Sequence, residues 1–164
     1  LAVRAVVQTS TAQVQALVDA TAERFGGIDI VVANAGVGAY GPLVELRADH
    51  LDEMIDTNVK GVFFLTQKLL PQLEAGATAE DPSRVINIGS IDGLHTPSFD
   101  TVSYGPSKAA LHTLTRQLAA KLVRRNIVMN AIAPGPYPTW MLSTGVGTGG
   151  DVEPGRGGAV RGRP

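Results

Sequence analysis

The chain has 164 residues, 44% of them hydrophobic, which is the length of one domain with enough apolar side chains to bury a core. Its 14 basic and 15 acidic residues nearly cancel, so the composition argues against nucleic acid and anionic membranes and favours small molecules or other subunits as partners. Cysteine is absent, which excludes disulfides and thiolate chemistry.

Strand-like and helix-like segments alternate along the chain. Four apolar runs rich in β-branched residues predict strands at residues 1–7, 28–36, 84–90 and 126–135. Three amphipathic stretches predict helices at residues 11–25, 49–73 and 104–124. This alternation predicts an α/β fold, a doubly wound parallel sheet with helices on both faces and right-handed crossovers.

Local residues indicate where the helices begin and end. Ser10 or Thr11 can cap the first helix, and the Gly26–Gly27 pair can end it. Asp49 is placed to cap the second helix. Parallel sheets bind ligands beyond the carboxyl ends of their strands, so the residues that follow strands are the candidates for chemistry.

Two stretches match the dinucleotide-binding pattern Gly-x-Gly-x-x-Gly. The match at residues 36–41 follows a strand, but Pro42 comes next and no helix is predicted before about residue 49. The match at residues 145–150 has neither the strand nor the helix. Since a helix N-terminus must receive the pyrophosphate, we attribute both matches to the abundance of glycine.

Other site classes have little support in the sequence. His50, His95 and His112 lie far apart without the spacing of metal ligands, so no metal site is predicted. The segment "LAVRAVVQ" lacks the features of a signal peptide, and the apolar runs are too short to span a bilayer. We therefore expect a soluble, cytoplasmic protein without a membrane partner.

Tyr104 and Lys108 stand at the start of the third predicted helix. Four residues apart on a helix, they share one face, where a phenol and an ammonium could share a proton. The alternative interpretation is structural, with a half-buried Tyr104 and a solvated Lys108. The pair alone does not decide between these readings.

Five segments in order resemble the short-chain dehydrogenase/reductase family, classical type. They are "ANAG" (33–36), "IDTNVKGVF" (55–63), "VINIGS" (85–90), "YGPSK" (104–108) and "NAIAPGPYPT" (130–139). The resemblance covers about residues 12–142. Within the family, the sequence is most similar to 3-oxoacyl-carrier-protein reductase-like and sugar-acid dehydrogenase-like members. It implies a Rossmann-like fold that binds NADP or NAD, with NADP slightly favoured.

The resemblance implies a catalytic set made of Asn58, Ser90, Tyr104 and Lys108. Tyr104 would be the acid or base, and Lys108 with the positive ring of the oxidised cofactor would lower the phenol pKa from about 10. Ser90 would hydrogen-bond the substrate oxygen, and Asn58 would position a water in a proton relay. Taken singly, Ser90 could merely end a strand and Asn58 could be an ordinary hydrogen bonder inside a helix.

The resemblance also implies residues that hold the cofactor. Asn34 would stabilise the sheet, while Ala35 and Gly36 would lie against the adenosine ribose; otherwise "NAG" is a simple turn signal. Tyr104 and Lys108 would flank the nicotinamide, with Lys108 on its ribose. The remaining cofactor-binding positions, expected at the nicotinamide carboxamide, are Pro134, Gly135 and Thr139.

The resemblance is incomplete at both ends of the chain. The family's opening strand, glycine-rich turn, helix and second strand have no counterpart, and residues 1–7 resemble the family's third strand. We expect residues 1–142 to form a partial domain that lacks the first βαβ portion, and residues 143–164 to form a glycine-rich flexible tail. We also expect that the 164-residue chain by itself binds neither dinucleotide below millimolar concentration.

Association is expected through the two helices that contain Asn58 and Tyr104, giving a homodimer or homotetramer. Family members commonly dimerise there, and both helices are apolar on several faces. Five hydrophobic side chains are too many for one side of a sheet to bury: Met54, Phe63, Phe64, Leu111 and Leu118.

These observations predict a nicotinamide-dependent oxidoreductase that interconverts a carbonyl and a secondary alcohol. The alternative is a non-catalytic homologue of the family that acts as a dimerisation or binding module. A hydrolase built on Ser90 lacks the Gly-x-Ser-x-Gly elbow and a plausible histidine and acid.

Overall fold

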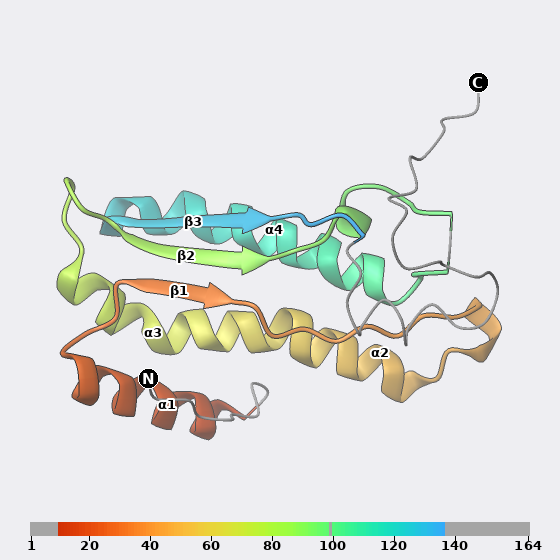
Figure 1. Cartoon of the computed structure of the whole chain (residues 1–164), viewed down its shortest axis with the longest axis horizontal. Helices are drawn as coiled ribbons and strands as arrows, with labels where there is room; N and C mark the ends of the chain where they lie inside the picture. Colours follow the sequence, from red (N-terminus) through yellow and green to blue (C-terminus); the bar gives the residue numbers. More distant parts are fainter. Residues whose placement is uncertain (1–9, 99, 137–164) are drawn as a thin grey trace.

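The computed structural model describes residues 10–98 and 100–136, and in that part of the chain three strands and four α-helices alternate. The predicted strand at 1–7, Thr139 and the predicted tail at 143–164 lie outside the described residues. Figure 1 shows the elements along the chain, which are α1 (Thr11–Phe25), β1 (Ile30–Ala33), α2 (Ala48–Ile55), α3 (Val62–Gly76), β2 (Ser83–Ile88), α4 (Tyr104–Leu122) and β3 (Ile127–Ile132).

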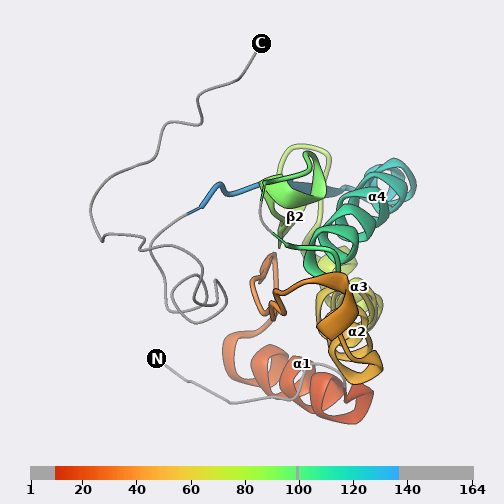
Figure 2. The same ribbon diagram turned by 90° about the vertical axis from the view of Figure 1, so that its right-hand side faces the viewer.

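The three described strands form a parallel sheet in the order β1-β2-β3, which confirms the predicted fold class. Val31 pairs with Val85, and Val85 in turn pairs with Met129. Because each crossover advances the sheet in the same direction, right-handed connections put α3 and α4 on the same face. Figure 2 shows this arrangement, with both helices on one side of the strands.

The main core lies between the sheet and these helices. It is made of Val18, Leu69, Leu73, Val85, Leu122, Ile127 and Met129. A second cluster of Ala33, Val62 and Leu111 continues it toward the carboxyl ends of the strands. Each large aliphatic side chain buried in this way contributes about 1.5–3 kcal/mol, so the core anchors α4 firmly along β3.

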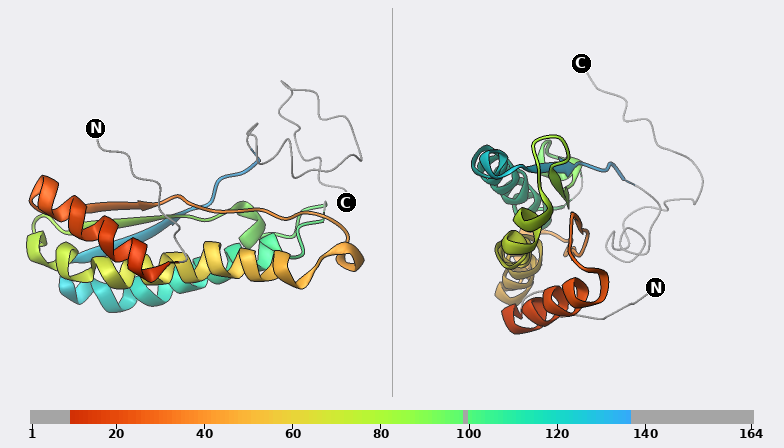
Figure 3. Two further views of the ribbon diagram at one scale, coloured as in Figure 1. Left: turned by 90° about the horizontal axis from the view of Figure 1, so that it is seen from below. Right: turned by 90° about the vertical axis from the view of Figure 1, so that its left-hand side faces the viewer.

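The two sides of the sheet differ in what covers them. α1 packs beside α3 at the β1 edge, as Figure 3 shows from below and from the end. Within residues 10–98 and 100–136, no helix lies over the opposite face, where Ile30, Val32 and Ile132 are 59%, 55% and 52% exposed. Strands that are apolar on both faces thus have one face covered by the described helices.

The helix boundaries confirm most of the sequence predictions. Ser10 caps α1 by accepting a hydrogen bond from the Gln13 amide, and Gly26 ends that helix with a φ of 83°, a left-handed conformation that favours glycine. The prediction that Asp49 caps the second helix is wrong, because α2 begins at Ala48 and has Arg47 in the cap position. The Asp49 carboxylate instead pairs with the Arg47 guanidinium, which lowers the pKa of Asp49 to about 2.

The predicted helix at 49–73 is two α-helices joined by a π-helical turn over Asp56–Gly61. The apolar residues expected to mediate association, on this segment and on α4, are less available than predicted, because Met54 and Leu111 are both buried within the chain. Phe63 is 41% exposed, and Phe64 and Leu118 are half-buried. In the described ranges, no helix has both the length and the apolar character needed to cross a bilayer.

Candidate active site

The four predicted catalytic residues come from three elements that meet beyond the carboxyl ends of the strands. Asn58 lies in the π-helical turn, Ser90 follows β2, and Tyr104 and Lys108 stand in the first two turns of α4. All four are buried. Burial of so many polar groups requires specific partners, and these partners define the geometry of the site.

Lys108 is buried rather than solvated. Only 4% of the residue is exposed, and Nζ donates a hydrogen bond of 2.8 Å to the carbonyl oxygen of Ile88 on β2. Nζ lies 5.6 Å from the centroid of the Tyr104 ring, which confirms that the two side chains share a face of α4. Desolvation lowers the pKa of Lys108 to about 8, so the ammonium remains mostly charged at neutral pH.

Ser90 lies close enough to Tyr104 to act on its phenol as a hydrogen-bond partner, which lowers the pKa of Tyr104. The Ser90 Oγ also accepts a hydrogen bond of 3.2 Å from the Asp92 amide, in a short helical turn over Ile91–Gly93. Burial raises the pKa of Tyr104, the Ser90 hydrogen bond lowers it, and the Asp92 carboxylate raises it, with a net upward direction. The sequence predicted a lowered pKa, but within the protein itself desolvation outweighs the lowering effect.

Asn58 is fully buried, and its side-chain amide holds two segments together. Its Oδ1 accepts from the Val37 amide and its Nδ2 donates to the Val37 carbonyl, both at 3.0 Å. Nδ2 also donates to Ser107 Oγ at 2.9 Å, and that hydroxyl donates to the Tyr104 carbonyl at 2.7 Å. Asn58 therefore ties the loop after β1 to the first turn of α4, and both of its amide hydrogens are used.

The predicted cofactor-binding residues fall into two groups. Gly36 passes close to the catalytic set, since a Cβ there would lie 3.2 Å from Asn58 Oδ1 and 3.3 Å from Lys108 Nζ. Asn34 and Ala35 are exposed in the segment just before it.

Pro134 and Gly135 follow β3 and are also exposed. The Pro134 carbonyl accepts a hydrogen bond of 3.0 Å from Ile91, the residue after Ser90. The segments after β2 and β3 are thereby joined, while Thr139 is outside the described residues.

Sequence reasoning missed His112, which lies one turn beyond Lys108 on the same face of α4. Its Nε2 is 3.0 Å from the Ser90 carbonyl oxygen, so the ring touches the Ser90 main chain. The repeated spacing of Tyr104, Lys108 and His112 was a signal for this position. The contact itself depends on how the loop after β2 folds back on the helix.

Tyr40 and Asp92 are two further groups beside Tyr104 that the sequence did not single out. The Tyr40 and Tyr104 ring centroids are 5.5 Å apart. Burial, with the nearby Tyr104 and Asp92 charges, raises the pKa of Tyr40 to about 12, so this phenol stays neutral. Desolvation raises the pKa of Asp92.

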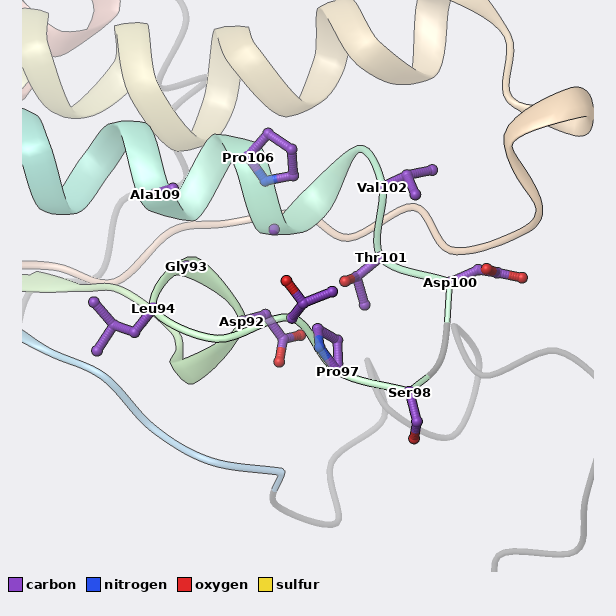
Figure 4. A pocket seen from close by; sticks show the side chains of 12 residues that line it. Asp92, Gly93, Leu94, Pro97, Ser98, Asp100, Thr101, Val102, Pro106 and Ala109 are labelled. Atoms are coloured by element: carbon purple, nitrogen blue, oxygen red, sulfur yellow. The ribbon is translucent and has the colours of Figure 1, made fainter. Parts of the chain in front are cut away.

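A pocket of about 560 Å³ opens between the loop after β2 and the start of α4. Figure 4 shows the side chains of Asp92, Pro97 and Thr101 around it, with Pro106 and Ala109 on the helix. Ser90, Tyr104 and Lys108 are not among its lining residues, so the pocket lies beside the catalytic set. Asp92 borders the pocket and also acts electrostatically on Tyr104, so it links the two regions.

Comparisons with known proteins show what the chain and its fold are similar to. The rhamnolipid biosynthesis 3-oxoacyl-[acyl-carrier-protein] reductase of Pseudomonas aeruginosa is 42% identical over 133 residues, which cover 81% of this chain and 52% of the relative. The solved NADP active-site complex of RhlG from Pseudomonas aeruginosa has a TM-score of 0.81 at 40% identity, covering 85% of this chain and 54% of that one.

A second solved structure has a similar fold. The 3-ketoacyl-(acyl-carrier-protein) reductase of Brucella melitensis in complex with NADH has a TM-score of 0.79 at 28% identity, over 85% of this chain and 58% of that one. The chain thus spans about half the length of the relatives it matches. A sequence model of the short chain dehydrogenase family matches residues 2–146, and the chain belongs to that family.

Proposed function

We propose that the protein is an NAD(P)-dependent oxidoreductase that interconverts a carbonyl and a secondary alcohol at Tyr104, Ser90 and Lys108. The observation that carries this proposal is the buried Lys108 ammonium 5.6 Å from the centroid of the Tyr104 ring, with the buried Ser90 hydroxyl beside the phenol. A hydroxyl pair of this kind can bind one substrate oxygen from two sides, and a nearby cation favours the phenolate that must form.

Each side chain has a separate task. Tyr104 gives a proton to the substrate oxygen during reduction and takes it back during oxidation. Ser90 donates a hydrogen bond to the same oxygen and fixes its distance from the phenol. Lys108 stabilises negative charge on Tyr104, and Asn58 holds the first turn of α4 in register while its remaining Oδ1 lone pair is available to a relay water.

The residues around Gly36 fit a dinucleotide. A side chain at this position would fill the space beside Asn58 and Lys108, so glycine leaves room for a bound group against the main chain. Among the described residues, the Lys108 ammonium donates one hydrogen bond, to the Ile88 carbonyl, although an ammonium has three donors. The other hydrogens suit the hydroxyls of a nicotinamide ribose, with Ala35, Gly36 and the Pro134–Gly135 turn along the rest of the cofactor.

The bound nicotinamide would supply or accept the hydride. NADP is slightly favoured, because the Pseudomonas aeruginosa relative was solved with NADP, although the Brucella melitensis relative was solved with NADH. The rhamnolipid biosynthesis reductase of Pseudomonas aeruginosa and the Brucella melitensis enzyme are both acyl-carrier-protein reductases, which favours a 3-oxoacyl compound as substrate, and a sugar acid is the second candidate.

We also propose a homodimer or homotetramer that uses the helices around Asn58 and Tyr104. Phe63 on α3 and Leu51 on α2 are 41% and 49% exposed, and such side chains suit a helix-to-helix interface. The same surfaces favour the rival function, a non-catalytic binding module of the family. Cross-linking or light scattering that found a monomer at micromolar concentration would contradict the association.

The function is tested with a fusion that joins this chain to the nucleotide-binding start of the Pseudomonas aeruginosa relative. We expect NADPH oxidation with a 3-oxoacyl thioester, and its loss in the Tyr104→Phe version of the same fusion. A fusion that binds NADP and yet reduces neither 3-oxoacyl thioesters nor keto sugar acids would favour the binding-module alternative. Equal activity with and without the Tyr104 hydroxyl would refute the catalytic assignment.

A further inference from the structure

His112 is a buried histidine whose ring faces the main chain of Ser90. The residue is 7% exposed, and its Nε2 is 3.0 Å from the Ser90 carbonyl oxygen and 3.4 Å from the Ser90 amide nitrogen. The His112 ring therefore contacts both polar main-chain atoms of Ser90, a residue assigned to the reaction.

Two glycines that flank Ser90 make room for this ring. A Cβ on Gly89 would lie 2.3 Å from His112 Cε1 and 2.7 Å from Nε2, which no side chain could occupy without displacing the ring. A Cβ on Gly93 would lie 2.9 Å from His112 Cδ2 and 2.7 Å from the Ala109 amide nitrogen. The loop is thus closed tightly on the histidine from both sides of Ser90.

The geometry favours the tautomer of His112 that carries its hydrogen on Nε2. A neutral imidazole has one donor and one acceptor nitrogen, and the shorter contact is the one to the carbonyl oxygen, so Nε2–H donates to Ser90. The Ser90 carbonyl also accepts from the Gly93 amide at 3.1 Å. Two donors on one carbonyl fix the orientation of the peptide that carries the Ser90 side chain.

We propose that His112 is a positioning residue, which fixes the main chain at Ser90 and so keeps the Ser90 hydroxyl on the Tyr104 phenol. The inference rests on the proposed function, because it assigns importance to that hydroxyl pair. His112 touches neither reacting atom and acts through Ser90. This positioning role also explains why a polar ring is buried at the third position of the Tyr104–Lys108–His112 face.

The ionisation of Tyr104 reports on this contact without any cofactor. Phenolate absorbance is titrated in a Tyr40→Phe, Tyr137→Phe background, in which Tyr104 is the remaining tyrosine of the three in the chain. The groups that act on its phenol in this background are Ser90, Asp92 and Lys108. Because the Ser90 hydrogen bond lowers the pKa of Tyr104, His112→Leu should shift that pKa upward.

Two variants at position 112 separate positioning from packing. Gln places an amide nitrogen close to where Nε2 stands, so His112→Gln should return the Tyr104 pKa toward that of the parent, whereas Leu should not. Thr113→Leu, on the exposed neighbouring position of α4, is the matched control and should leave the pKa unchanged. In a Ser90→Ala chain, His112→Leu should add no further shift.

The outcomes distinguish the inference from the proposed function. An unchanged Tyr104 pKa in His112→Leu, beside an upward shift in Ser90→Ala, would overturn the role of His112 and leave the Ser90–Tyr104 pair intact. No shift in Ser90→Ala would refute that pair and the inference with it. Failure of Gln to restore the pKa would assign His112 to packing alone.

A second experiment tests the same contact if His112→Leu fails to fold. Gly89→Ala keeps the imidazole but displaces it, and we expect the same upward shift of the Tyr104 pKa. Combined with His112→Ala, which empties the space, the Gly89→Ala change should have little further effect. An equal effect of Gly89→Ala with and without the ring would contradict the proposed contact.

Discussion

The two halves of α4 bury different kinds of side chain. The first half buries the polar side chains of Tyr104, Ser107, Lys108 and His112 beside a single large aliphatic residue, Leu111, and each polar group makes a specific contact. The second half places Leu118, Ala119 and Leu122 against the main core. Thr115 stands between the halves and accepts a hydrogen bond of 2.9 Å from Asn87 on β2.

This difference shows how one helix can carry a reactive surface. Burying Lys108 and His112 is unfavourable unless their polar atoms are paired, so these polar side chains add little net stability. The apolar second half stabilises the helix against β3 and thereby holds the polar half in place. Function and stability should therefore respond to substitutions in different parts of the same element.

The largest expected effect is the loss of turnover in Tyr104→Phe. This change removes only the ionisable oxygen, and in the active fusion kcat should fall about 10²–10⁴-fold while the affinity for NADP stays nearly constant. Tyr40→Phe is the matched control, because it removes a phenol that packs beside Tyr104 and to which the proposed function gives no proton transfer. Rates from single-turnover kinetics and affinities from fluorescence titration decide the matter, and a small loss in Tyr104→Phe would contradict the assignment.

The next effect concerns the apolar half. Leu122→Ala removes a buried side chain from the core and should lower the free energy of unfolding by about 2–5 kcal/mol, measured by urea denaturation. Val123→Ala, next along the chain and 59% exposed, should change it by less than about 0.5 kcal/mol. In the folded protein the pKa of Tyr104 should be the same in both variants. A shifted Tyr104 pKa in Leu122→Ala would show that the halves are not separate.

Lys108 gives the polar half a pH dependence of its own. Its pKa is lowered from 10.5 to about 8, so between these values the unfolded chain binds more protons and stability rises with pH. We expect this rise from pH 8 to about 10 in urea unfolding, below the range in which the raised tyrosine pKa values act in the opposite direction. Lys108→Met should lack the rise, and an identical pH profile in both proteins would mean that the ammonium is solvated.

The smallest effect is expected at Asp92. Asp92→Asn removes a negative charge that raises the pKa of Tyr104, so that pKa should decrease. Asp100→Asn alters another carboxylate at the same pocket, and we expect it to leave Tyr104 unchanged. The phenolate absorbance titration measures both. Equal shifts of the Tyr104 pKa in the two variants would indicate that Tyr104 responds to the total negative charge around the pocket and not to Asp92 in particular.

Much of the first half of α4 could be predicted from the sequence. Helical periodicity places Tyr104 and Lys108 on one face, and the alternation of strands and helices predicts that Ser90 meets them beyond the sheet. Each of these inferences uses only the repeat of a regular element. That regularity is why they agree with the structure.

The features that the sequence did not predict depend on irregular backbone and on burial. The π-helical turn around Asn58 contains no proline that would mark a break, so the sequence predicted one continuous helix. The His112 contact requires the loop after β2 to return to the helix, which no local pattern encodes. The direction of the Tyr104 pKa depended on the balance between desolvation and nearby charge, and only the folded structure fixes that balance.

The π-helical turn over Asp56–Gly61 also constrains how this segment tolerates insertions and deletions. A wider turn holds one residue more than an α-helical path between the same points, and each residue of an α-helix rotates the chain by about 100°. Removing one residue here would restore a straight helix and turn either α2 or Asn58 away from its present neighbours. Length is therefore as strongly fixed in this turn as residue identity is, and its alignment in homologues should show substitutions without gaps.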